Sequence, residues 1–90
     1  MTINFKEYDN IIKECRQIAV RKNRDYGTDY LVKYGPKGML IRISDKIGRL
    51  DNLIGKGQNM RVGDEKVNDT LEDIVNYCVY MIMLNNNKLL

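Results

Sequence analysis

Four polar side chains that could do chemistry recur through the C-terminal part of the chain. Asp69, Asp73, Asn76 and Tyr80 follow one another at offsets of four, three and four residues, so on a helix they would form one row. Carboxylates in such a row can hold a hard metal ion such as Mg²⁺ or act as counter-charges for nearby cations. The row indicates a polar site on this segment and leaves both chemistries open.

A second charged row lies between residues 42 and 49. Arg42, Asp45, Lys46 and Arg49 fall on one side of a predicted helix, at spacings of three, one and three residues. As plain surface, Asp45 and Arg49 would form an i,i+4 ion pair worth about 0.3–0.5 kcal/mol. The alternative is a second packing surface, because small and apolar residues lie beside these charges.

Basic and aromatic residues are concentrated between positions 22 and 34. Lys22 can meet phosphate, and Tyr26 can stack on a base or contact a ribose. The same stretch also holds Arg24, Asp25, Tyr30, Lys33 and Tyr34. In the competing interpretation, Gly27 ends a helix and the tyrosines are half-buried packing residues. Composition alone leaves both interpretations open.

The residues that the chain lacks narrow the possible enzyme classes. The 90 residues include no histidine, which removes histidine-based acid–base catalysis, Ser-His and Cys-His pairs and most zinc sites. A catalyst would have to use carboxylates, lysines, tyrosines or Mg²⁺. The formal charge of +3 suits a phosphorylated small molecule and is too weak to argue for a nucleic acid polymer.

The cysteines and the hydropathy pattern indicate the cellular compartment in which we expect the protein. Cys15 and Cys78 both lie among apolar residues, so we expect two buried free thiols in a reducing compartment. The longest apolar run, between Val75 and Leu84, is far too short to span a bilayer. We expect a cytoplasmic protein without a membrane partner.

The elements that must position these rows are three predicted helices. Asn4 and Glu7 form a capping box that starts the first helix at Phe5, and this helix should run to about residue 24. Pro36 at the first helical position predicts a second helix to about residue 53. The third should run to about residue 85, capped by Asp64 or by Asp69, which precedes Glu72 as in an N-cap signature. Residues 55–59 are predicted to be a connecting loop.

Apolar stripes on these helices predict the core. The second helix should bury Leu40, Ile43, Ile47, Leu50 and Ile54, and the third should bury Leu71, Ile74, Val75, Cys78 and Ile82. We predict an all-α single domain over residues 1–90, with the first helix packed across a hairpin of the other two. Small and apolar residues off the core stripe of the second helix, namely Ile41, Ser44 and Gly48, predict a homo-oligomer with its site near a subunit boundary.

Four ordered segments resemble the nucleotide modification associated domain 1 family, which is found in bacteriophages and bacteria. They are Lys22–Gly27, Ile41–Leu50, Val62–Glu65 and Asp69–Tyr77. The resemblance extends from about residue 22 to residue 83. It implies a nucleotide ligand and supplies no reaction.

A more distant resemblance is to the all-α MazG-like nucleoside triphosphate pyrophosphohydrolases. In those enzymes carboxylates on two helices hold Mg²⁺, and the matching positions here are Asp45, Asp69 and Asp73. The paired glutamates of their first motif are absent, and Ser44, Lys46 and Arg49 stand nearby instead. Cations in place of metal ligands favour direct phosphate binding over hydrolysis.

Three hypotheses follow from the sequence. The first is a non-enzymatic binder that sequesters a phosphorylated nucleotide, either a standard one or a cyclic or modified one, as in phage counter-defence in the host cytoplasm; it needs no cofactor or metal. Its site would comprise Lys22, Asp25, Tyr26, Arg42, Lys46, Arg49, Asp73 and Asn76. The second is a Mg²⁺-dependent pyrophosphohydrolase built on Asp45, Asp69 and Asp73. The third is a helical protein-interaction module.

Overall fold

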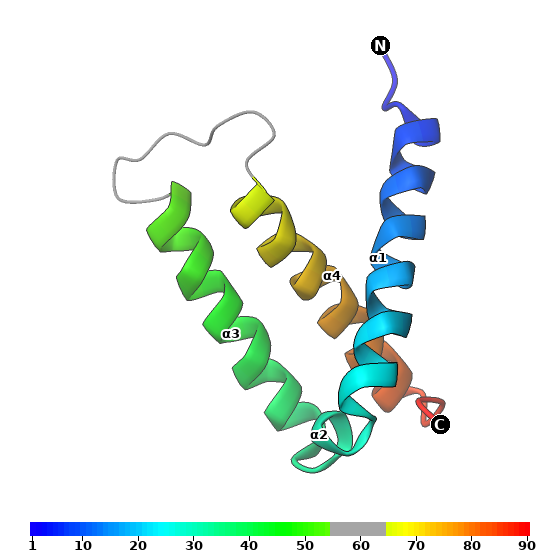
Figure 1. The fold of residues 1–90 in the computed structure, drawn as a ribbon, viewed down its shortest axis with the longest axis vertical. Helices are drawn as coiled ribbons and strands as arrows, with labels where there is room; N and C mark the ends of the chain where they lie inside the picture. Colours follow the sequence, from blue (N-terminus) through cyan, green and yellow to red (C-terminus); the bar gives the residue numbers. More distant parts are fainter. Residues whose placement is uncertain (55–64) are drawn as a thin grey trace.

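Helices are the only regular secondary structure in residues 1–54 and 65–90, the part of the chain that the computed structural model describes. They are α1 (Phe5–Tyr26), α2 (Asp29–Val32), α3 (Gly35–Ile54) and α4 (Glu65–Asn85). Helices α3 and α4 lie side by side as a hairpin, α1 crosses α4, and α2 links α1 to α3 (Figure 1). The all-α prediction is confirmed, and α2 is an additional short helix that was not predicted.

The predicted start and break of α1 are confirmed. The side chain of Asn4 caps the helix, because its Oδ1 accepts a hydrogen bond from the backbone N–H of Glu7 at 3.1 Å. The helix ends at Gly27, which has a φ of 73° and donates its N–H to the carbonyl of Asn23 at 2.8 Å. This conformation favours glycine. Helix α1 is two residues longer than predicted.

The bounds of α3 and α4 settle one question about Asp69. Helix α3 begins at Gly35, one residue before the predicted start, and ends one residue later than predicted. Helix α4 begins at Glu65, so Asp69 lies inside it and is not its N-cap; that alternative was wrong. Asp64 and the predicted loop at residues 55–59 lie outside the described residues.

The predicted core stripes of α3 and α4 are wrong in part, because Ile43, Leu50, Ile74 and Val75 are half-buried whereas the other members are exposed in the single chain. Leu40 on α3 is 56% exposed and Ile82 on α4 is 60% exposed. Ile47, Ile54, Leu71 and Cys78 are also exposed in the single chain. The side chains that α3 turns inward are Met39, which is fully buried, and the half-buried Arg42 and Lys46. Lys46 pairs with Asp73 of α4, so charged residues lie at the contact between the two helices, while Leu40 and Ile47 stay exposed in the single chain.

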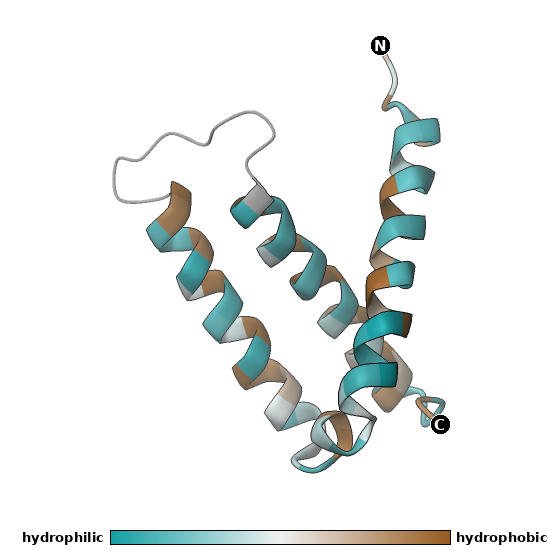
Figure 2. Cartoon of the chain, viewed as in Figure 1, coloured by the Kyte–Doolittle hydropathy of each residue, from teal (hydrophilic) through white to brown (hydrophobic). Residues whose placement is uncertain are grey.

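Apolar residues therefore lie both inside and outside the fold. Figure 2 shows hydrophobic residues recurring between hydrophilic ones along α1, α3 and α4, as in amphipathic helices. Cys15 is buried as predicted, whereas Cys78 lies on the outward stripe of α4 and is exposed. In the described segments, no helix has the length and apolar character needed to cross a membrane.

Candidate functional site

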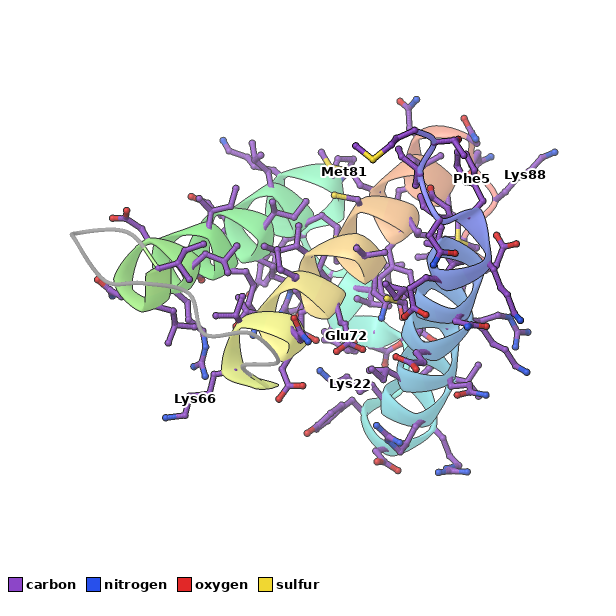
Figure 3. All side chains as sticks on the ribbon, turned by 90° about the horizontal axis from the view of Figure 1, so that it is seen from above. Phe5, Lys22, Lys66, Glu72, Met81 and Lys88 are labelled. Carbon is purple, nitrogen blue, oxygen red and sulfur yellow. The ribbon has the colours of Figure 1, made fainter. Side chains whose placement is uncertain are left out.

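One carboxylate joins three parts of the fold. Asp73 of α4 accepts a hydrogen bond from the Nζ of Lys22 on α1 at 2.7 Å, and its second oxygen lies 2.9 Å from the Nζ of Lys46 on α3. The side chain of Asp73 is 15% exposed and that of Lys22 is 42% exposed. In Figure 3, Lys22 lies between α1 and α4, on the side that bears Glu72. Two cations from different helices thus converge on one half-buried anion.

The two lysines keep Asp73 ionised despite its burial. Burial alone would raise the pKa of this carboxyl, but hydrogen bonds from Lys22 and Lys46 and their charges hold the pKa below its ordinary value. Burial opposes the charge on Lys22, yet the hydrogen bond to Asp73 and its charge raise the pKa of that ammonium group. At neutral pH Lys22 is therefore an ammonium group and Asp73 a carboxylate.

Aromatic residues surround this cluster and form what we call the tyrosine pocket. It is an open pocket of about 470 Å³ lined by Lys22, Tyr26, Tyr30, Arg42, Lys46, Asp73 and Tyr77. The rings of Tyr26 and Tyr30 meet edge to face, with their centres 6.3 Å apart. The guanidinium carbon of Arg42 lies 4.9 Å from the centre of the Tyr30 ring, and its Nη2 donates to the Tyr30 carbonyl at 3.4 Å. Arg42 thereby ties α2 to α3.

The phenol of Tyr30 stays protonated at neutral pH. Burial, together with the neighbouring Tyr80 and Tyr77, raises its pKa above the ordinary value. A neutral phenol can both donate and accept a hydrogen bond. The tyrosine pocket therefore combines cations with aromatic faces and neutral hydroxyl groups, the side chains that contact the phosphate, base and sugar of a nucleotide.

A second pocket adjoins the first along α3, and we call it the arginine pocket. It measures about 810 Å³ and is lined by Arg42, Asp45, Lys46, Gly48, Arg49, Asp51, Asn52 and Tyr77. Arg42, Lys46 and Tyr77 line both pockets. The Nε of Arg49 donates to the hydroxyl of Thr70 on α4 at 3.1 Å. The two pockets form one continuous polar surface over the α3–α4 hairpin.

Three residues of the predicted sites lie outside both pockets. Asp25 is exposed, and its carboxylate lies 3.9 Å from the Nε of Arg24. Asn76 is buried and donates its side-chain N–H to the carbonyl of Cys15 at 2.9 Å, so it joins α4 to α1. Asp69 is exposed on α4. The other predicted ligand-binding residues, Lys22, Tyr26, Arg42, Lys46, Arg49 and Asp73, line one pocket or both.

Sequence reasoning missed two residues of the site that helical spacing could have identified. Tyr77 follows Asp73 by four residues and lines both pockets, while Thr70 precedes Asp73 by three residues and contacts Arg49. Residues three or four positions apart on a helix share a face. Counting outward from Asp73 would have found both of them. Tyr30, which also lines the tyrosine pocket, lies on α2. No sequence pattern indicated that short helix.

The carboxylates of the described residues lie apart from one another. Among residues 1–54 and 65–90, no three carboxylate or thiol side chains lie close enough together to hold a metal ion. Asp73 already faces two ammonium groups, which would repel a divalent cation. Asp45, Asp69 and Asp73 therefore do not form the carboxylate cluster that the MazG-like interpretation requires.

Comparison with known proteins identifies a family over most of the chain. The model of the nucleotide modification associated domain 1 family matches residues 22–84. This range contains every residue that lines the tyrosine pocket and the arginine pocket. Searches among curated proteins and among solved structures found no match.

Proposed function

This chain belongs to the nucleotide modification associated domain 1 family, and on that premise we propose that it binds a phosphorylated nucleotide and holds it without turnover. The observation that carries this proposal is the convergence of Lys22 and Lys46 on Asp73 beside the aromatic rings of the tyrosine pocket. The two ammonium groups would bind a phosphate group, and Tyr26 would stack on the base or contact the sugar.

The charge balance of the pocket favours an anionic ligand. Lys22, Lys46 and Arg42 supply three positive charges against the single carboxylate of Asp73. Asp73 holds the two ammonium groups close together before any ligand binds. Ligand binding therefore does not have to order these two side chains, which lowers its entropic cost. A bound phosphate would share these cations with Asp73.

The side chains of the pocket support sequestration more than catalysis. Asp73 is engaged by two lysines, and the chain has no histidine to move a proton. A protein of this kind acts by lowering the free concentration of its ligand. In a phage-infected cell this activity would remove a host signalling nucleotide from the cytoplasm, which is a counter-defence role.

The outward apolar stripes support assembly of several copies of the chain. Leu40 and Ile47 on α3 and Ile82 on α4 are exposed, as are Phe5 and Ile12 on α1. Exposed apolar surface on several helices is typical of a protein–protein interface. We propose a homo-oligomer in which these stripes are buried and the polar pockets lie near the subunit boundaries.

Two readings compete with the nucleotide binder. A helical interaction module is favoured by the same exposed apolar stripes, because they fit a different protein as well as a second copy. A Mg²⁺-dependent pyrophosphohydrolase would need the carboxylates Asp45, Asp69 and Asp73 to move together and Asp73 to leave its lysines. The experiment below separates all three.

The test is a thermal-shift measurement with mono-, di-, tri- and cyclic nucleotides, with and without Mg²⁺. We expect at least one nucleotide to raise the melting temperature of the natural protein. Lys22→Met and Lys46→Met should each weaken its binding about tenfold or more, as expected for loss of a charge-assisted hydrogen bond. Lys13→Met removes the same charge from an exposed position on α1 and should leave binding unchanged.

The outcome of the same incubation decides between binding and turnover. An intact nucleotide recovered by chromatography after denaturing the protein supports sequestration, whereas a Mg²⁺-dependent product would establish an enzyme. If no nucleotide raises the melting temperature, only the interaction module survives. Native mass spectrometry of the purified protein should show more than one subunit, and a monomer at micromolar concentration would contradict the oligomer.

A further inference from the structure

Thr70 is a buried polar side chain that is hydrogen-bonded to Arg49, a residue of the arginine pocket. It lies on α4 and is 2% exposed. Its hydroxyl donates to the backbone carbonyl of Lys66 at 2.8 Å and accepts the hydrogen bond from the Nε of Arg49 at 3.1 Å. The bond to Lys66 lies within α4, as is common for a threonine in a helix. The bond from Arg49 is an additional contact that joins α3 to α4.

The two bonds of Thr70 are arranged in series. Because the hydroxyl hydrogen is directed at the Lys66 carbonyl, the oxygen presents its lone pairs to Arg49. The bond engages the Nε of the guanidinium group and does not use its two terminal nitrogens, and Arg49 lines the arginine pocket. An arginine held in this way keeps its paired donors for a planar or tetrahedral anion.

The position of Arg49 relative to Lys46 defines a second anionic subsite. Arg49 follows Lys46 by three residues on α3, and side chains at this spacing are neighbours on a helix. Lys46 lines both pockets, whereas Arg49 lines the arginine pocket. A ligand with one phosphate group at Lys22 and Lys46 would therefore bring a second phosphate group toward Arg49.

We propose that Thr70 is a positioning residue that holds Arg49 ready to bind a second phosphate group of the ligand. This inference rests on the proposed nucleotide binding and adds that the ligand carries more than one phosphate group. Thr70 itself does not touch the ligand. It restricts the rotamers of Arg49, whose free side chain would otherwise lose conformational entropy on binding.

Inorganic pyrophosphate and inorganic phosphate test this inference independently of the base. Pyrophosphate can reach both subsites, whereas phosphate occupies the lysine subsite alone, so the natural protein should bind pyrophosphate more tightly. Thr70→Val keeps the shape of the side chain and removes the hydroxyl. We expect it to weaken pyrophosphate binding roughly fivefold, since it removes one hydrogen bond to a charged group and frees one arginine side chain, and to leave phosphate binding unchanged.

Three variants separate positioning from mere structural support. Thr70→Ser restores the hydroxyl and should restore pyrophosphate binding. Arg49→Ala should lose the preference for pyrophosphate, and adding Thr70→Val to Arg49→Ala should have no further effect, because the two residues act through one bond. Asn68→Ala, at an exposed position on the same helix, should change nothing.

Several results would overturn the inference. They are equal binding of phosphate and pyrophosphate by the natural protein, a Thr70→Val effect that persists in the Arg49→Ala background, and a preference for pyrophosphate that survives Arg49→Ala. A preference for pyrophosphate that survives Arg49→Ala overturns the inference even if Thr70→Val fails to fold, and in that case Thr70→Ala replaces Thr70→Val in the double variant. Failure of the whole proposed function is distinct, because then no nucleotide would bind and Lys22→Met would not alter the binding of either probe.

Discussion

Helices α1 and α3 both pack against α4, but they do so through different kinds of contact. Helix α3 runs beside α4 as a hairpin (Figure 1), and its side chains Lys46 and Arg49 bond to Asp73 and Thr70 along the shared face. Helix α1 crosses α4 over a shorter junction. That junction contains the bond from Asn76 to the Cys15 carbonyl and the bond from Lys22 to Asp73.

Both the α1–α4 junction and the α3–α4 junction contribute residues to the tyrosine pocket. Arg42 and Lys46 come from α3, whereas Lys22 and Tyr26 come from α1. The side of the pocket that α1 supplies depends on few polar bonds. A change at the α1 junction should therefore weaken ligand binding even where it costs little stability, whereas a change in the buried apolar packing of α3 should affect mainly the fold.

The largest expected effect tests the packing of α3. Met39→Ala removes a side chain that is 0% exposed and should lower the free energy of unfolding by about 3 kcal/mol, since large-to-small substitutions in a core leave a cavity. Lys37→Ala is the control, because this exposed side chain on the same helix should cost less than about 1 kcal/mol when truncated. Urea unfolding measures both variants. Equal costs for the two would show that α3 is not packed through Met39.

The next effect tests the junction of α1. Asn76→Ala removes the buried amide that bonds to the Cys15 carbonyl and should lower the free energy of unfolding by about 1.5 kcal/mol, because it removes a buried hydrogen bond that joins α4 to α1. Nucleotide binding should weaken as well, since Lys22 loses a support of its helix. Asn68→Ala, exposed on the same helix, should cost little. A stability loss without any loss of binding would contradict the coupling between this junction and the pocket.

A smaller effect tests the carboxylate that both junctions share. Asp73 has a lowered pKa in the folded chain, so its contribution to stability is fully present above the unfolded value of about 3.9 and is lost as the pH falls through the folded value. Asp73→Asn should cost about 1 kcal/mol at neutral pH, a modest amount because solvent screens the lysines. The difference from the natural protein should shrink toward zero below about pH 3.9. Urea unfolding at several pH values measures this difference in the free energy of unfolding. A difference that does not change with pH would rule out the ionised Asp73 as its source.

The sequence predicts the helices well, but it predicts only in part which face of each helix is buried. Capping by Asn4, the break at Gly27 and the helical periods depend on local interactions, and these predictions are confirmed. Which stripe faces inward depends on partners far apart in the chain, such as the pair of Lys46 with Asp73. Hydrophobicity alone put Leu40 and Ile82 in the core, although both are exposed in the single chain. The bond from Asn76 to the Cys15 carbonyl is another contact between distant parts of the chain that no local pattern indicates.

The smallest effect tests the far end of α1, where the helix is least attached. Asn4→Ala removes the cap bond to the N–H of Glu7. Because Phe5, Tyr8 and Ile12 are exposed near this end, fraying should cost the isolated subunit only about 0.5 kcal/mol, at the low end for a lost cap. Hydrogen exchange should become faster for the amides of the first turn and stay unchanged near Lys22, since local opening need not spread through a helix whose other end is anchored. Exchange that also rises near Lys22 would mean that α1 opens as one unit, and the distinction between its free end and its junction with α4 would fail.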